Sequence, residues 1–177
     1  NNRSHNTLTP GDSLQDPKAV APIIAFASTP LRAFAVANLT SAYPNTAKTV
    51  LRGIALLDRA RVLVQDEVTG LTPGTPLTWR LLTEAKIKFS ADARVATLRQ
   101  DGRTLRAEIL APAAARFSTL PATPPSAAER QNAGVSVLAA DVTLSAPDAS
   151  LAILLTPVGD RWPASLPPPA LRPLAEW

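Results

Sequence analysis

Apolar and polar residues alternate with a period of two along most of the chain. In KIKFS (86–90), Ile87 and Phe89 alternate with lysines, which is typical of a strand that buries one face. The same alternation runs through RVLVQDEV (61–68) and LTWRLL (77–82). Further strands are predicted at 20–28, 32–40, 49–57, 94–100, 103–110, 134–144 and 150–158. We therefore predict an all-β fold, an antiparallel β-sandwich of about ten short strands.

Three segments refine this picture. Asp101-Gly102 lies between two predicted strands and is typical of a tight hairpin turn. The apolar run at 150–158 fits a buried strand, although an Asp or Ser cap before it also allows a helix. The stretch 110–132 has two proline clusters and no alternation, so it predicts a long surface loop.

The C-terminal segment RWPASLPPPALRPLAEW (161–177) is rich in proline. Because proline has no backbone N–H to donate, this segment cannot form a central strand. We expect an extended or polyproline II conformation, with Trp162 and Trp177 holding it against a surface. The predicted organisation is a single β-sandwich domain over 1–160, followed by a tail at 161–177 that packs on it.

Composition excludes several classes of protein. The chain has no cysteine, so disulfides, thiolate metal sites and cysteine nucleophiles are absent. It has no methionine, even at position 1, and we expect a processed chain or a piece of a longer one. No signal peptide and no membrane-spanning run is visible. The net charge of +4 comes from dispersed basic residues without aromatic stacking groups, so we expect no nucleic-acid partner.

Residues that could carry chemistry are few. His5 is the only histidine, and no HxH or HExxH spacing accompanies it, so by itself it is interpreted as a surface residue. A nucleophile elbow of the form GxSxG is absent. Asp66 and Glu67 are neighbours on a predicted strand, so they point to opposite faces and cannot flank one glycosidic bond. Tyr43 could act as a base, but an amphipathic ring packed at the turn before Pro44 is the preferred interpretation.

Several motifs follow one another in a fixed order: RSHNTL (3–8), GDSLQD (11–16), AVANLTSAYPN (35–45), TVLRGIALLDRARVLVQDEVTG (49–70) and LTWRLLTEA (77–85). This series resembles the C-terminal half of the heparinase II/III-like polysaccharide lyases, a family that includes oligoalginate lyases. Arg52, Asp66 and Trp79 occupy the places of the family's strand arginine, aspartate and tryptophan. The resemblance runs from residue 3 to residue 85, and agreement is looser through the final strands.

The resemblance implies that the intact protein cleaves uronic-acid polysaccharides, such as alginate or heparan sulfate, by β-elimination. The catalytic tyrosine and the Asn or His of the family lie upstream of the matched region, and Tyr43 does not match that tyrosine. We therefore expect no catalytic residue in this chain and no activity from it alone. The implied partners are an acidic polysaccharide and an upstream α-toroid domain of the same protein, and the implied location is periplasmic or secreted.

The resemblance also bears on His5. In family members with a structural metal, the histidine of the HNT motif resembles a zinc ligand whose partners, a His and an Asp, lie upstream. His5 is thus implied as a metal ligand in the intact protein, with zinc not held by this chain alone. The alternative function is a non-catalytic carbohydrate-binding or structural β-sandwich module, which the mild basicity of the chain favours.

Overall fold

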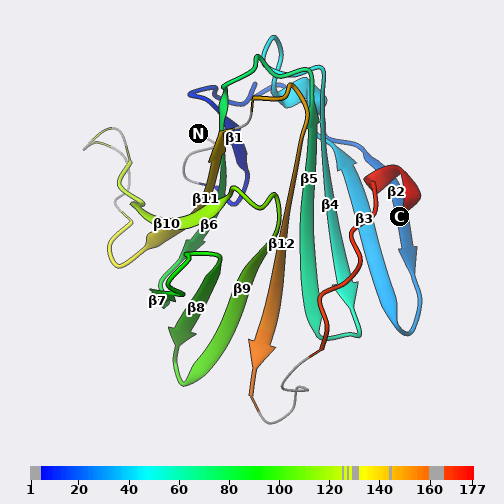
Figure 1. The fold of residues 1–177 in the computed structure, drawn as a ribbon. Coiled ribbons are helices and arrows are strands. Elements are labelled where there is room, and N and C mark those ends of the chain that lie inside the picture. Colours follow the sequence, from blue (N-terminus) through cyan, green and yellow to red (C-terminus); the bar gives the residue numbers. More distant parts are fainter. Residues whose placement is uncertain (1–4, 125, 127, 129–131, 144, 160–165) are drawn as a thin grey trace.

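The computed structural model describes residues 5–124, 126, 128, 132–143, 145–159 and 166–177. These residues form two antiparallel sheets and two short 3-10 turns, η2 (Thr40–Ala42) and η3 (Leu174–Glu176) (Figure 1). The strands are β1 (Leu8–Pro10), β2 (Ile23–Ser28), β3 (Arg32–Asn38), β4 (Thr49–Leu57), β5 (Arg61–Thr69), β6 (Pro76–Thr83), β7 (Lys86–Phe89), β8 (Val95–Gln100), β9 (Arg103–Ala111), β10 (Arg116–Pro121), β11 (Ser136–Thr143) and β12 (Ala149–Val158). The predicted all-β antiparallel sandwich is confirmed.

The two sheets differ in size. The small sheet has the order β1-β6-β11-β10, and the large sheet has the order β2-β3-β4-β5-β12-β9-β8-β7. The large sheet therefore ends in β2 on one side and β7 on the other, and β2 lies beyond the small sheet (Figure 1). Among the described residues, the strands of the small sheet do not extend over the β2 end of the large sheet.

The hydrophobic core lies between the sheets. Leu77 and Trp79 of β6 project from the small sheet, and Ile109 of β9 and Ile153 of β12 project from the large one. The period-two alternation of these strands places one face of each in this core, as the sequence predicts. Burial of each large aliphatic side chain contributes about 1.5–3 kcal/mol to folding.

A smaller cluster lies on the outer face of the large sheet. It consists of Ala55, Leu63, Ala152 and Leu154, and Trp177 from the end of the chain packs against it. The Trp177 ring also meets Phe34 of β3 edge to face, with 5.9 Å between ring centroids. Trp177 therefore holds the end of the chain on the outer face of the large sheet. Trp162 and the predicted boundary at residue 160 lie outside the described residues.

Polar contacts also fasten the tail. Arg61 donates to the carbonyl of Pro167 at 2.7 Å, and Gln65 donates to the carbonyl of Arg172 at 2.8 Å. The backbone N–H of Leu174 donates to the carboxylate of Glu67 at 2.8 Å. Arg61, Gln65 and Glu67 share the outer face of β5 with Leu63, so the tail is held there by polar contacts beside an apolar one.

Three elements bear on individual sequence predictions. The predicted loop at 110–132 is wrong in part, because β10 pairs with β11 over six residues inside it. The predicted strand at 150–158 is confirmed and the alternative of a helix is wrong, since this segment pairs with both β5 and β9. β1 was not predicted as a separate strand, and only three residues of it pair with β6. No helix in the part of the chain that the structure describes is long and apolar enough to cross a membrane.

Candidate functional site

The best-defined polar site is an ion pair on the inner face of the large sheet. Arg52 of β4 and Asp66 of β5 are register partners, so their side chains project side by side. The guanidinium donates to both carboxylate oxygens, from Nε to Oδ1 and from Nη2 to Oδ2, each at 2.7 Å. The side chains are 11% and 1% exposed. Burial lowers the pKa of Arg52, but the charge and hydrogen bonds of Asp66 outweigh this, so its pKa is raised above the usual value.

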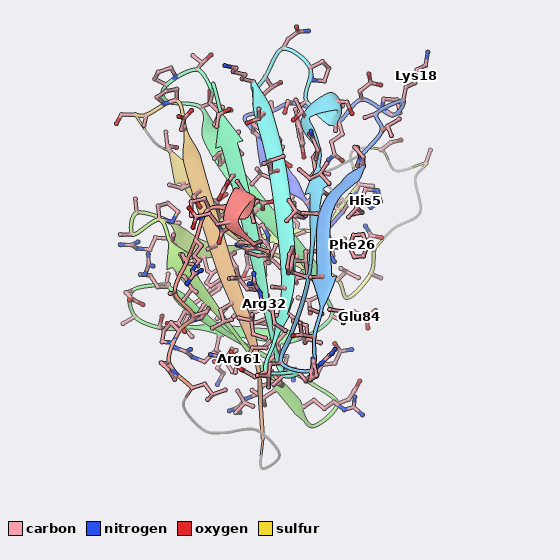
Figure 2. The ribbon with its side chains drawn as sticks, turned by 90° about the vertical axis from the view of Figure 1, so that its right-hand side faces the viewer. His5, Lys18, Phe26, Arg32, Arg61 and Glu84 are labelled. Atoms are coloured by element: carbon pink, nitrogen blue, oxygen red, sulfur yellow. The ribbon has the colours of Figure 1, made fainter. Side chains whose placement is uncertain are left out.

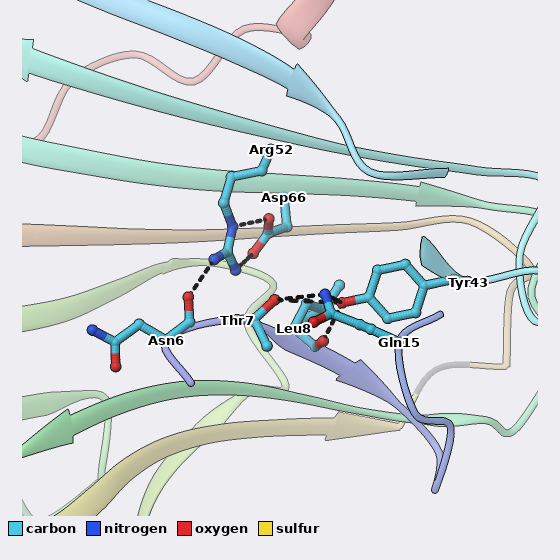
Figure 3. Close-up of polar contacts among 7 residues, drawn as sticks. All are labelled: Asn6, Thr7, Leu8, Gln15, Tyr43, Arg52 and Asp66. Carbon is cyan, nitrogen blue, oxygen red and sulfur yellow. Dashed lines mark hydrogen bonds and ion pairs between the residues drawn. The ribbon is translucent and has the colours of Figure 1, made fainter. Parts of the chain in front are cut away.

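The ion pair also holds the N-terminal segment. The remaining guanidinium nitrogen of Arg52, Nη1, donates to the backbone carbonyl of Asn6 at 2.8 Å (Figure 3). The side-chain oxygen of Asn6 in turn accepts the backbone N–H of Leu82, on β6, at 2.8 Å. Asn6 therefore connects the large sheet to the small one, and the Arg52–Asp66 pair fixes the residue that follows His5.

A second group of hydrogen bonds lies beside the first and centres on Tyr43. Its hydroxyl donates to the carbonyl of Leu8 at 2.5 Å and accepts from the amide of Gln15 at 2.8 Å (Figure 3). The Gln15 amide is also 3.3 Å from the hydroxyl oxygen of Thr7. Tyr43 thus ties the strand after the HNT motif to the turn at η2, and Gln15 of the GDSLQD motif completes the contact.

Burial decides the chemical state of Tyr43. The side chain is fully buried, and desolvation raises the pKa of the phenol above its usual value despite the hydrogen bonds from Thr7 and Gln15, which lower it. A neutral phenol whose hydrogen is donated to a backbone carbonyl is not available as a base. The interpretation of Tyr43 as a ring packed at a turn is confirmed.

His5 lies at the exposed start of this segment. Its backbone carbonyl accepts the N–H of Thr7 at 2.9 Å, which bends the chain just before β1. Within the described residues no group of three or more His, Asp or Glu side chains converges to hold a metal ion, and the nearby carboxylate of Asp66 is occupied by Arg52. The described residues therefore do not by themselves fit a zinc site, and the ligand role of His5 stays a prediction.

The other residues singled out by sequence have structural roles. Trp79 is buried in the core between the sheets. Asp66 faces Arg52 while Glu67 faces the tail, so the two carboxylates lie on opposite faces of β5, as predicted. Sequence reasoning did not find the contacts of Asn6 and Gln15. The closeness of the HNT and GDSLQD motifs is a signal for the contact of Gln15 with Thr7, whereas the contact of Asn6 with Arg52 leaves no such signal.

Comparison with known proteins identifies solved structures that share this fold. No family model matches the sequence, and a search of curated proteins found no match. Among solved structures, a heparinase III aligns over 87% of this chain with a TM-score of 0.68 and 15% sequence identity. Heparan sulfate lyase HepC from Pedobacter heparinus aligns over 88% with a TM-score of 0.64 and 14% identity.

This chain covers only 23% of that heparinase III and 24% of HepC. It therefore spans about a quarter of the length of the enzymes that it matches. The resemblance read from the motif order is confirmed at the level of the fold, which the chain shares with one part of these heparinases.

Proposed function

We propose that this chain is the β-sheet part of a polysaccharide lyase that cleaves uronic-acid-containing glycans by β-elimination. The observation that carries the proposal is the fold, which matches heparinase III and heparan sulfate lyase over nearly nine tenths of the chain. In β-elimination, a base removes the proton at C5 of the uronate while its carboxylate is neutralised. The C4–O bond then breaks, a C4=C5 double bond forms, and the leaving oxygen takes up a proton.

The base and the carboxylate-neutralising groups are proposed to come from another part of a longer protein. Two features of the described residues support this. Tyr43, the single tyrosine, is buried and already donates its hydrogen to Leu8. Arg52, a largely buried cation on the inner face of the large sheet, is committed to Asp66 and to the carbonyl of Asn6. Neither side chain is free to touch a substrate, so both act as supports for the segment that carries His5.

Exposed apolar residues at the β2 edge support a larger assembly. Phe26 of β2 is 80% exposed and projects away from the sheet (Figure 2). Ile24 of β2 and Ile54 of β4 are also about half exposed. Exposed apolar side chains near the edge of a sheet favour association with another protein layer. They are therefore unusual on a surface that stays in contact with water. We propose that the upstream domain implied by the resemblance covers this edge.

His5 is proposed to be one ligand of a structural zinc whose other ligands come from outside residues 1–177. The support is the way its neighbour is held: Asn6 is anchored to Arg52 on one sheet and to Leu82 on the other. Such contacts to a flanking residue fix the direction of a metal ligand and strengthen binding. A periplasmic or secreted location is proposed with the same assignment, since the substrate is an extracellular polysaccharide.

The test compares residues 1–177 alone with the longest form of the protein that occurs naturally, which we call the longest form. Both are incubated with heparan sulfate and with alginate, and the unsaturated uronate ends are measured by ultraviolet absorbance. We expect product from the longest form and none from residues 1–177. Turnover by residues 1–177 would contradict the assignment of the base to another part of the protein.

A further inference from the structure

β7, β8 and β9 form the end of the large sheet opposite to β2 (Figure 1). The registers of these strands place several basic residues on their outer face. Lys86 and Lys88 alternate with Ile87, which packs against the core, so both lysines project to the other side. Lys86 is the register partner of Arg99 on β8. On the same face, Lys88 is paired with Thr97, and Thr97 is paired with Arg106 on β9.

The arrangement concentrates positive charge. Cross-strand register partners have Cβ atoms about 4.5–5.5 Å apart, so Lys86 and Arg99 place two cations side by side. Like charges that are directly opposed destabilise a sheet. Lys86, Lys88 and Arg99 are all exposed, and no ion-pair partner exists for them among the described residues. Repulsion between these cations therefore destabilises the folded state, and a bound anionic ligand would remove that repulsion.

Nearby carboxylates do not neutralise this face. Glu108 of β9 shares it, but its carboxylate is already bound by Arg106. Glu84 lies within hydrogen-bonding reach of Gln100, whose position on β8 is on the core-facing side with Leu98. Among the strand positions on this face, Lys86, Lys88, Arg99 and Arg106 are cationic and Glu108 alone is anionic.

Hydroxyl groups accompany the cations. Thr97 and Thr156 are the register partners of Arg106 on its two sides, and Thr104 is the register partner of Arg99. All three threonines are half-buried, so they form the floor between longer basic side chains. No aromatic ring occupies these positions, so a ligand would be held by charge and hydrogen bonds rather than by stacking. Arginine and threonine together suit sulfate and carboxylate groups.

This face lies away from the site described above. The Arg52–Asp66 pair is on the inner face of the large sheet, whereas the lysines of β7 project from its outer face. β4 and β7 are also separated in the sheet by β5, β12, β9 and β8. A ligand on β7–β9 therefore occupies a second surface of the chain.

We propose that the outer face of β7–β9 binds an acidic polysaccharide through its sulfate or carboxylate groups. The choice of ligand class rests on the proposed function, which makes an acidic polysaccharide the material that this protein meets. A polymer held at this face, outside the Arg52 region, would keep the protein on its substrate between cleavage events. Because the contacts are exposed ion pairs, binding weakens as salt screens them.

The test measures binding of a size-defined heparan sulfate oligosaccharide to residues 1–177 by isothermal titration calorimetry at low salt. The variant Lys86→Gln/Lys88→Gln removes two charges from the face. The matched control Lys18→Gln/Lys48→Gln removes two exposed charges elsewhere. We expect at least a ten-fold weaker affinity for the first variant and less than a two-fold change for the control. Raising the salt concentration is expected to weaken binding by the unmodified chain.

Three results would overturn the inference: no saturable binding, equal losses in the two variants, or a DNA duplex that binds as tightly as the oligosaccharide. Circular dichroism confirms that each variant keeps its β structure. The readout is binding by residues 1–177, whereas the proposed function is read as product from the longest form. A negative result in the binding experiment therefore leaves the proposed function testable by the product assay, and the reverse also holds.

Discussion

Arg52 and Asp66, partners across β4 and β5, form two hydrogen bonds of 2.7 Å, and the same guanidinium binds the carbonyl of Asn6. A bidentate pair leaves one edge of the guanidinium available for a further acceptor. Here that edge faces the N-terminal segment. The pair therefore determines where the chain carrying His5 meets the sandwich, as well as joining two strands of one sheet.

Removing the carboxylate should leave Arg52 charged and without its partner in a nearly closed site. Asp66→Asn is expected to lower the free energy of unfolding by about 3 kcal/mol, because an unpaired buried charge is costly. Urea unfolding followed by circular dichroism measures the change.

The control for this prediction is Glu108→Gln. Glu108 pairs with Arg106, and these two side chains are 24% and 42% exposed. A pair that water reaches contributes less than about 1 kcal/mol, because water and salt screen it. Equal destabilisation by the two substitutions would contradict the role given to the Arg52–Asp66 pair.

Tyr43 is the only tyrosine, so the phenolate absorbance of the protein reports on this one group. Burial raises the pKa of the Tyr43 phenol above its usual value of 10.0 in the folded state. Its contribution to stability is therefore fully present below pH 10 and is lost as pH rises through the folded-state pKa. A spectrophotometric titration should show ionisation at higher pH in the native protein than in urea. Ionisation at the same pH in both would mean that Tyr43 is not buried as described.

Two parts of the fold could be predicted from sequence because the signals are local. Asp101-Gly102 does form the turn between β8 and β9, and the alternation in 86–90 does form β7. β10 was missed, because Arg116–Pro121 is short, lies between prolines and gains its partner only from β11, which is distant in sequence. Pairing between segments that are separated in sequence produces no periodic pattern within either segment.

The candidate site also combines features that the local sequence predicts with contacts that it does not predict. The neighbouring positions of Asp66 and Glu67 were enough to predict that they face opposite sides of a strand. The contact of Arg52 with Asn6 could not be predicted from spacing, because it joins residues 46 positions apart through a backbone carbonyl. Every residue type has a backbone carbonyl, so any residue at position 6 that leaves the backbone undistorted can accept this hydrogen bond. The residue type at position 6 therefore does not reveal the contact.

The tail offers a further test, at Gly53. A Cβ on this residue would lie 2.7 Å from the Trp177 ring and would also overlap the Leu174 side chain. Gly53→Ala is therefore expected to displace the C-terminal residues and to speed their removal by carboxypeptidase, while the rest of the sandwich stays folded. Gly159→Ala is the control, because a Cβ there meets nothing within 4 Å. Unchanged digestion in Gly53→Ala would contradict the packing of Trp177 on β4.

The most direct measurement of the central claim is the formation of unsaturated uronate ends by the longest natural form of the protein, given heparan sulfate and alginate. We expect product from at least one of these polysaccharides. We also expect a large loss of product in Arg52→Met at equal folded protein, because Asn6, beside His5, then loses its hydrogen bond to the large sheet and keeps only the one to Leu82. Absence of product from the unmodified protein with every uronate polysaccharide tested would contradict its assignment as a lyase.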